Sequence, residues 1–100
     1  MDDNMQNISR LIGIDYGSKN IGIAISDATL TIASPFCIIK NFSLKRSALE
    51  ILEISKKNNV SMLILGLPIN MNGSLGEMSK VVYKFIDTIK CFSNIAIETV

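Results

Sequence analysis

The sequence predicts an α/β domain built on a mixed five-stranded sheet, with its elements in the order β-β-β-α-β-α-β. Several short Ile-rich runs either alternate apolar with small or polar residues or are wholly apolar, and both patterns are typical of strands. Two longer segments carry apolar residues at helical spacing, and each separates two such runs. Strands in direct succession favour antiparallel pairing, whereas strands joined through a helix favour parallel pairing. We therefore expect an antiparallel half followed by a parallel half.

The first three strands are predicted over residues 11–15, 21–26 and 31–39. The second places isoleucines on one face and small residues on the other, which suggests close packing over the small face. The connection over 16–20 contains Gly and Asn, which tolerate positive φ and favour a hairpin. Pro35 indicates an edge position or a bulge for the third strand.

Two helices and two more strands complete the order. Ser43 is a predicted N-cap for a helix that ends near 56–59. The run over 60–67 is nearly all apolar, which predicts a central strand buried on both faces. Ser74 and Glu77 form a capping box for the second helix, and a fifth strand is predicted over 94–100. The second helix carries one apolar stripe: Met78, Val81, Val82, Phe85, Ile86 and Ile89.

Composition bounds the class of protein. One hundred residues with 48% apolar content indicate one globular domain, which we place at 11–100 after a frayed segment 1–10. No apolar run is long enough for a membrane helix. A cytoplasmic protein is expected, with its cysteines kept as free thiols by a reducing cytosol. The lack of histidine excludes histidine bases and most zinc sites in this chain. Cys37 and Cys91 are predicted to be free, buried or half-buried thiols. A net charge of +1 neither favours nor excludes nucleic acid.

Asp15 is the leading candidate for chemistry, because it ends an apolar strand just before a turn built on Gly17. With a loop over 17–20, Asp15 faces Gly22 and Asp27 faces Arg10. The two aspartates are then roughly 17 Å apart and should not share a metal.

The strand over 60–67 should lie parallel to the first strand, and sites in such sheets gather at the carboxyl ends of the parallel strands. Asp15 and the loop over 70–73 would meet there. Lys19 is the cation that we expect to contact phosphate, because it lies close to Asp15. The alternative role of Asp15 is to cap the turn through its own side chain.

Two motifs carry a family resemblance. Gly13-Ile-Asp15-Tyr-Gly17-Ser-Lys19 with its continuation to Asp27, and Gly66-Leu-Pro-Ile-Asn70-Met-Asn72-Gly73-Ser74, both resemble the YqgF (RuvX) family. These are Holliday-junction-resolvase-like proteins, also described as nucleases of pre-16S ribosomal RNA. The resemblance covers essentially all residues after Arg10, in the family's order and spacing.

The resemblance implies a ribonuclease-H-like fold and hydrolysis of phosphodiester bonds with Mg²⁺ or Mn²⁺ held on carboxylates. Asp15 would be the catalytic first-strand metal ligand. The substrate would be pre-rRNA or branched DNA. Nucleic-acid contacts would come from Gly17, Lys19, Asn70, Asn72 and Gly73.

The chain departs from the family pattern at three places. The family continues after the fifth strand with an Asp-Glu-Arg motif and a further acid near a C-terminal helix, whereas this sequence ends at Val100. Asn20 stands where many relatives carry a basic residue, and Asn72 replaces an Asp. We therefore expect a domain incomplete at its C-terminus, without C-terminal helices, that can be inactive as given. Glu98 is a candidate second metal ligand. An uncovered sheet face or edge would lead to a homodimer or to poor solubility.

Two other functions stay open. Sugar kinases and actin-like ATPases also begin with Asp-x-Gly in a hairpin that holds phosphate, so the chain could be a phosphotransferase-like, phosphate-binding fragment. Binding of ATP-Mg without affinity for branched DNA or RNA would favour that reading. A domain that kept the fold and lost the site would instead bind nucleic acid without cleaving it.

Overall fold

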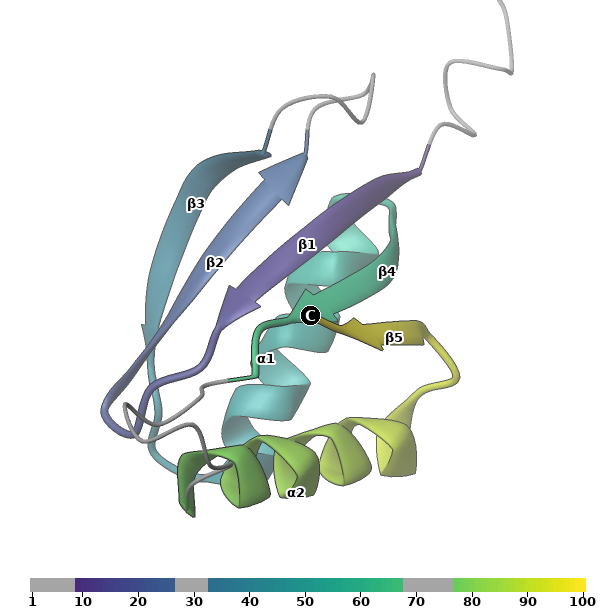
Figure 1. Cartoon of the computed structure of the whole chain (residues 1–100). Coiled ribbons are helices and arrows are strands. Elements are labelled where there is room, and N and C mark those ends of the chain that lie inside the picture. Colours follow the sequence, from purple (N-terminus) through teal and green to yellow (C-terminus); the bar gives the residue numbers. More distant parts are fainter. Residues whose placement is uncertain (1–8, 27–32, 68–76) are drawn as a thin grey trace, which may run out of the picture.

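The computed structural model describes residues 9–26, 33–67 and 77–100. It confirms the predicted order of helices and strands. The sheet has the strand order β3-β2-β1-β4-β5 (Figure 1). The elements in chain order are β1 (Arg10–Asp15), β2 (Asn20–Ser26), β3 (Ala33–Lys40), α1 (Leu44–Lys57), β4 (Val60–Leu65), α2 (Glu77–Phe92) and β5 (Ala96–Thr99). Strand ends differ from the predicted ones by up to two residues where the structure describes them.

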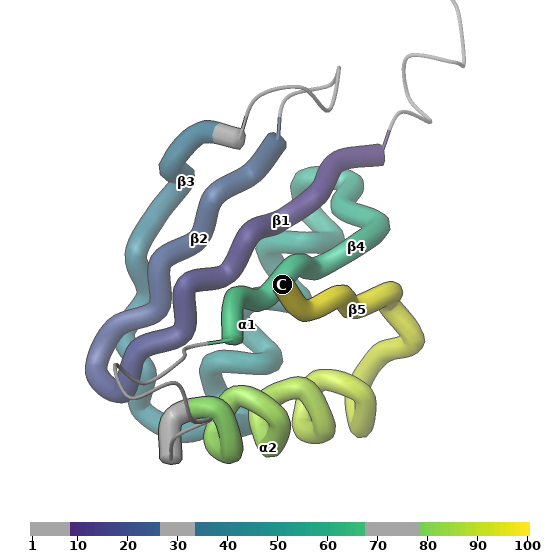
Figure 2. The backbone as a smooth tube through the Cα atoms, in the orientation of Figure 1, coloured from purple at the N-terminus to yellow at the C-terminus, as the bar shows by residue number. Residues whose placement is uncertain are grey.

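The sheet is antiparallel on one side and parallel on the other, as expected. β2 pairs antiparallel with both β1 and β3, whereas β4 pairs parallel with β1 and with β5. Figure 2 shows β1, β4 and β5 running in one direction, with their carboxyl ends on the same side. The chain therefore gathers three strand ends at one edge, where the sequence placed the candidate site.

β3 lies at the sheet edge and carries a bulge, which confirms the interpretation of Pro35. Ile23 pairs with Cys37 and Ala24 pairs with Pro35, so Phe36 is the extra residue. A proline is tolerated there because an edge strand need not donate its N–H to a second neighbour.

Both helices lie to one side of the sheet, and the core forms between them and that face (Figure 1). Alternate residues of each strand point into this core, as the two-residue period of a strand requires. The stripe predicted for α2 supplies four buried residues. The buried side chains are Ile12, Ile14, Ile21, Ile23, Ile25, Ile39, Ala48, Ile51, Leu63, Leu65, Val82, Phe85, Ile86 and Ile89.

The opposite face of the sheet is covered by none of the described elements. The prediction that 60–67 is buried on both faces is therefore wrong: in β4, Leu63 and Leu65 are buried, Met62 and Ile64 are half-buried and Ser61 is exposed. The small residues Gly22 and Ala24 of β2 also lie on this face, with no described element packed over them. We call it the open face.

Local signals explain how α1 is placed. Ser43 is the N-cap, as predicted: its Oγ accepts a hydrogen bond from the Arg46 N–H at 3.1 Å. Lys56 and Lys57 stand in the last turn, where cations interact favourably with the helix dipole. Asp27, Ser74 of the predicted capping box and the segment 1–8 lie outside the described residues.

Candidate functional site

Asp15 ends β1 in the middle of the sheet and projects from the open face. It pairs with Gly22 on β2, as the hairpin register predicted. On its other side the ladder continues from the Ile14–Leu65 pair to Gly66. The Val100 N–H donates to the Leu65 carbonyl and the Leu67 N–H donates to the Val100 carbonyl, both at 3.0 Å, so Val100 lies opposite Gly66. One row across four strands therefore reads Gly22, Asp15, Gly66, Val100.

The two glycines that flank Asp15 leave room around its carboxylate. A Cβ on Gly66 would meet nothing within 4 Å, and one on Gly22 would touch only the Asp15 Cβ, at 3.6 Å. The Asp15 side chain is exposed and forms no hydrogen bond or ion pair with any described residue. Nothing described thus supports the turn-capping alternative, and the carboxylate oxygens are available to a ligand.

A shallow apolar groove of about 440 Å³ runs across the open face beside Asp15. Its floor is mostly small residues, with Ile38 and Ile64 standing at its sides.

Cys37 also lines the groove. Burial, and to a lesser degree the charge of Glu50, raises the pKa of this thiol above its ordinary value. The thiol is therefore protonated near neutral pH. Cys37 and Cys91 are both free, but Cys91 is exposed, contrary to expectation.

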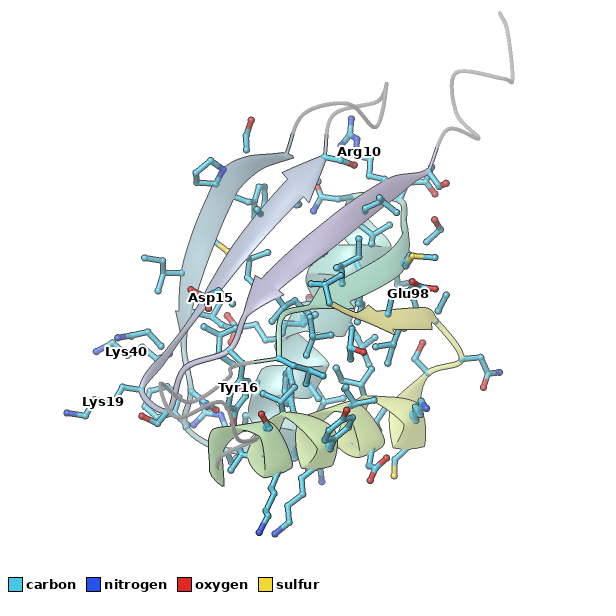
Figure 3. All side chains as sticks on the ribbon, viewed as in Figure 1. Arg10, Asp15, Tyr16, Lys19, Lys40 and Glu98 are labelled. Atoms are coloured by element: carbon cyan, nitrogen blue, oxygen red, sulfur yellow. The ribbon has the colours of Figure 1, made fainter. Side chains whose placement is uncertain are left out.

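Glu98, the other candidate ligand, lies on the same face but apart from Asp15 (Figure 3). It pairs with Ile64, and Ile64 pairs with Gly13, so Glu98 stands two residues back along the strands and two strands away. With strands about 4.8 Å apart and a rise of about 3.3 Å per residue, the two Cα atoms are about 12 Å apart. The described ranges hold no cluster of three potential metal ligands. Within the described residues, no second carboxylate therefore joins Asp15 in such a cluster.

Gly17 and Lys19 lie in the β1–β2 turn, next to Asp15. A Cβ on Gly17 would collide with the carbonyl oxygen of Asn20, so this turn requires glycine. Lys19 is exposed and lies beside Lys40 in Figure 3, near Asp15, whereas Arg10 is at the far end of β1. The predicted contacts Asn70, Asn72 and Gly73 lie outside the described residues.

The sequence reasoning missed Asn41, which joins the β1–β2 turn to α1. Its N–H donates to the Lys19 carbonyl at 2.9 Å, and its Nδ2 donates to the Gly17 carbonyl at 2.9 Å. Its Oδ1 accepts from the buried Ser47 hydroxyl at 2.8 Å. Ser47, a small polar residue on an otherwise apolar helix stripe, is the one signal that could have pointed to this link.

The far side of the turn is held by aromatic packing. Tyr16 contacts Phe85 of α2 with ring centroids 4.9 Å apart, and Phe85 is fully buried. Both sides of the β1–β2 turn are therefore anchored, one to α1 and one to α2. These contacts hold the turn that follows Asp15 in position from both sides.

The fold and the position of Asp15 define an α/β domain of the ribonuclease-H-like class. RuvC of T. thermophilus, solved in complex with a Holliday junction substrate, superposes with a TM-score of 0.62 at 11% identity, over 92% of this chain and 64% of RuvC. That likeness concerns the fold alone. The model of the family described as "RuvX: Holliday junction resolvase" matches residues 9–100, so the chain belongs to the RuvX family.

Curated relatives agree with the family model. A protein of Endomicrobium trichonymphae named "Putative pre-16S rRNA nuclease" is 55% identical over 93% of this chain and 66% of its own length. A protein of the same name from Natranaerobius thermophilus is 41% identical over 91% of this chain and 64% of its own length. The chain thus spans about two thirds of these relatives. No helix in the described ranges is long and apolar enough to cross a membrane.

Proposed function

We propose that this chain is part of a nuclease that cleaves phosphodiester bonds in structured nucleic acid, and that it contributes the edge of the sheet with the catalytic Asp15. The nuclease would act in processing of the 5′ end of pre-16S rRNA. Membership of the RuvX family and the names of the curated relatives support this activity. The substrate named for those relatives would place the protein in the cytoplasm. Because the chain spans about two thirds of them, the activity proposed is that of the whole protein.

The observation that carries the proposal is the row Gly22, Asp15, Gly66. An exposed carboxylate without a partner among the described residues stands between two residues that have no side chain. A phosphate of the substrate can approach it across the backbone, since nothing on either neighbouring strand stands in the way. The carboxyl ends of parallel strands are also where ligands bind in α/β sheets of this kind.

We propose that Asp15 supplies one carboxylate ligand to Mg²⁺ or Mn²⁺. Mg²⁺ is often held by one or two carboxylates together with phosphate oxygens and water, and the Asp15 oxygens fit that role. Such an ion activates water and stabilises the leaving oxygen. The Cα atom of Glu98 is about 12 Å from that of Asp15, so the two carboxylates are not neighbours on the sheet. With one carboxylate of the described residues in reach, we expect the ion to bind this chain weakly until the substrate phosphate joins it.

The test is a cleavage assay on a precursor rRNA substrate with the protein expressed from its whole gene. Asp15→Asn should lower the cleavage rate about 100-fold or more, since it removes a metal ligand. Asp87→Asn is the matched control, because Asp87 is an exposed carboxylate on α2, away from this edge. Equal cleavage by wild type and Asp15→Asn would refute the role of Asp15. Binding of the RNA without cleavage in Mg²⁺ or Mn²⁺ would refute a nuclease and favour a non-catalytic domain.

A further inference from the structure

An exposed aromatic ring stands at the edge of the molecule that carries Asp15. Phe42, in the short connection from β3 to α1, is 65% exposed. The Arg46 guanidinium lies over this ring, with Cζ 4.5 Å from the ring centroid. An exposed phenylalanine gains little in a folded chain unless something else packs against it. The arginine leaves most of the ring surface free for such a contact.

The position of Phe42 is fixed by the residues on either side of it. Asn41 is hydrogen-bonded to Gly17, Lys19 and Ser47, and Ser43 caps α1. The ring is therefore presented by a backbone tied to both the hairpin turn and the helix. A platform held in place in this way loses little conformational freedom when a ligand stacks on it.

Three cations lie near the ring: Lys40 and Arg46 flank Phe42 in the chain, and the Lys19 carbonyl accepts from the Asn41 N–H. Lys19, Lys40 and Arg46 are exposed, and none of them forms an ion pair with a described carboxylate. The first turn of α1 contains no acidic residue, and Glu50, one turn beyond Arg46, does not pair with it. The charge of this patch is thus strongly positive although the net charge of the chain is only +1.

The patch continues the surface that carries Asp15. Lys40 pairs with Asn20, and the next outward-facing pair is Gly22–Ile38, in the row of Asp15. Lys40 therefore leaves the sheet on the open face, as Asp15 does, and the two lie near one another in Figure 3. From strand spacing and rise, their Cα atoms are about 12 Å apart, so one strand of nucleic acid can contact both.

We infer that Lys19, Lys40, Phe42 and Arg46 form a binding site for an unpaired nucleotide, with its base stacked on Phe42 and its flanking phosphates held by the three cations. Aromatic rings bind bases through their π-faces without regard to sequence, and arginine adds both a cation and a second stacking plane. A paired base offers no free face, so the site selects a single-stranded stretch next to the bond at Asp15. This inference rests on the proposed function for its substrate and names which part of that substrate the chain holds.

The test measures binding by fluorescence anisotropy in EDTA, with labelled single strands of about 12 nucleotides and a duplex of the same sequence. Phe42→Leu removes the ring and keeps apolar bulk at an exposed position. It should weaken single-strand binding about tenfold, a loss typical of one base stack, and leave duplex binding unchanged. Phe92→Leu is the matched control, because Phe92 is also exposed but ends α2. RNA and DNA strands run in parallel show which sugar the site prefers.

A second pair of variants reads the phosphate contacts. Lys19→Gln and Lys40→Gln should each lower the slope of log affinity against log salt by about 0.7, whereas Lys84→Gln on α2 should not change it. Unchanged single-strand binding by Phe42→Leu, or an equal loss for the duplex, would overturn the proposal. Binding that needs charge alone would also overturn it. In that case poly-glutamate would displace the strand equally from wild type and from Phe42→Leu, and the two proteins would bind the strand with equal affinity. EDTA removes the divalent ions that cleavage would need, so binding through Phe42 is measured apart from cleavage. Intact binding through Phe42 together with no cleavage in Mg²⁺ or Mn²⁺ would refute only the nuclease.

Discussion

Asp15 owes its availability to its neighbours rather than to its own sequence position. In most strand rows a carboxylate would be flanked by side chains that shield it or bind it. Here both flanking residues are glycine, and a Cβ on Gly66 would touch nothing. The same row places Asp15 between an antiparallel and a parallel neighbour, at the centre of the sheet. An exposed carboxylate is thus set where, in the proposed function, backbone, ion and phosphate would come together.

Gly17 and Gly66 should respond differently to the same substitution. Gly17→Ala should destabilise the fold by about 1–3 kcal/mol, because its Cβ would collide with the Asn20 carbonyl. Gly66→Ala should change the free energy of unfolding by less than about 0.5 kcal/mol, since its Cβ meets open space. Urea denaturation of both variants measures this difference. Equal stability of the two variants would mean that the turn adapts to a side chain at Gly17.

At the level of elements, the β1–β2 turn, the β3–α1 connection and the start of α1 form one hydrogen-bonded unit through Asn41. The unit makes the position of Lys19 depend on the position of α1. The aromatic contact of Tyr16 with Phe85 ties the same turn to α2. The elements that carry the candidate site are therefore fixed by contacts outside the sheet ladder.

Asn41→Ala should destabilise the fold by about 1–3 kcal/mol, because the fully buried Ser47 hydroxyl then loses its acceptor. Thr88→Ala is the control: the Thr88 hydroxyl donates to the Lys84 carbonyl on the exposed side of α2, and its loss should cost much less. Thermal or urea unfolding compares the two. A cost for Asn41→Ala no larger than that for Thr88→Ala would show that Asn41 does not hold the turn to the helix.

At the scale of the whole molecule, the order and pairing of the strands could be predicted from the sequence. The cross-strand pair of Asp15 with Gly22 could be predicted as well. Hydrophobic period and connection length determine both. The one-sided burial of β4 could not be predicted, because an all-apolar run reads the same whether one or both of its faces are covered. Asn41 was missed because a single polar residue in a loop has no period. The distance of Glu98 from Asp15 depends on a cross-strand register that no hairpin fixes.

The open face predicts that this chain associates with itself. Ile38 is 74% exposed beside an apolar groove that no described element covers, and apolar surfaces of this kind mark contacts between proteins. Sedimentation of the 100-residue chain should show a concentration-dependent dimer. Ile38→Lys should weaken this association, whereas Leu49→Lys on α1 should not. A chain that stays monomeric at every concentration, or an Ile38→Lys variant that dimerises equally, would contradict the prediction.

The central claim, that Asp15 marks the ion- and phosphate-binding edge of the sheet, is tested most directly by Mn²⁺ titration followed by NMR. Bound Mn²⁺ broadens the signals of nearby amides even when it binds weakly. The expected result is broadening centred on Asp15, Gly22 and Gly66, stronger with a single-stranded oligonucleotide present and absent in Asp15→Asn. Broadening centred elsewhere, or unchanged in Asp15→Asn, would contradict the claim.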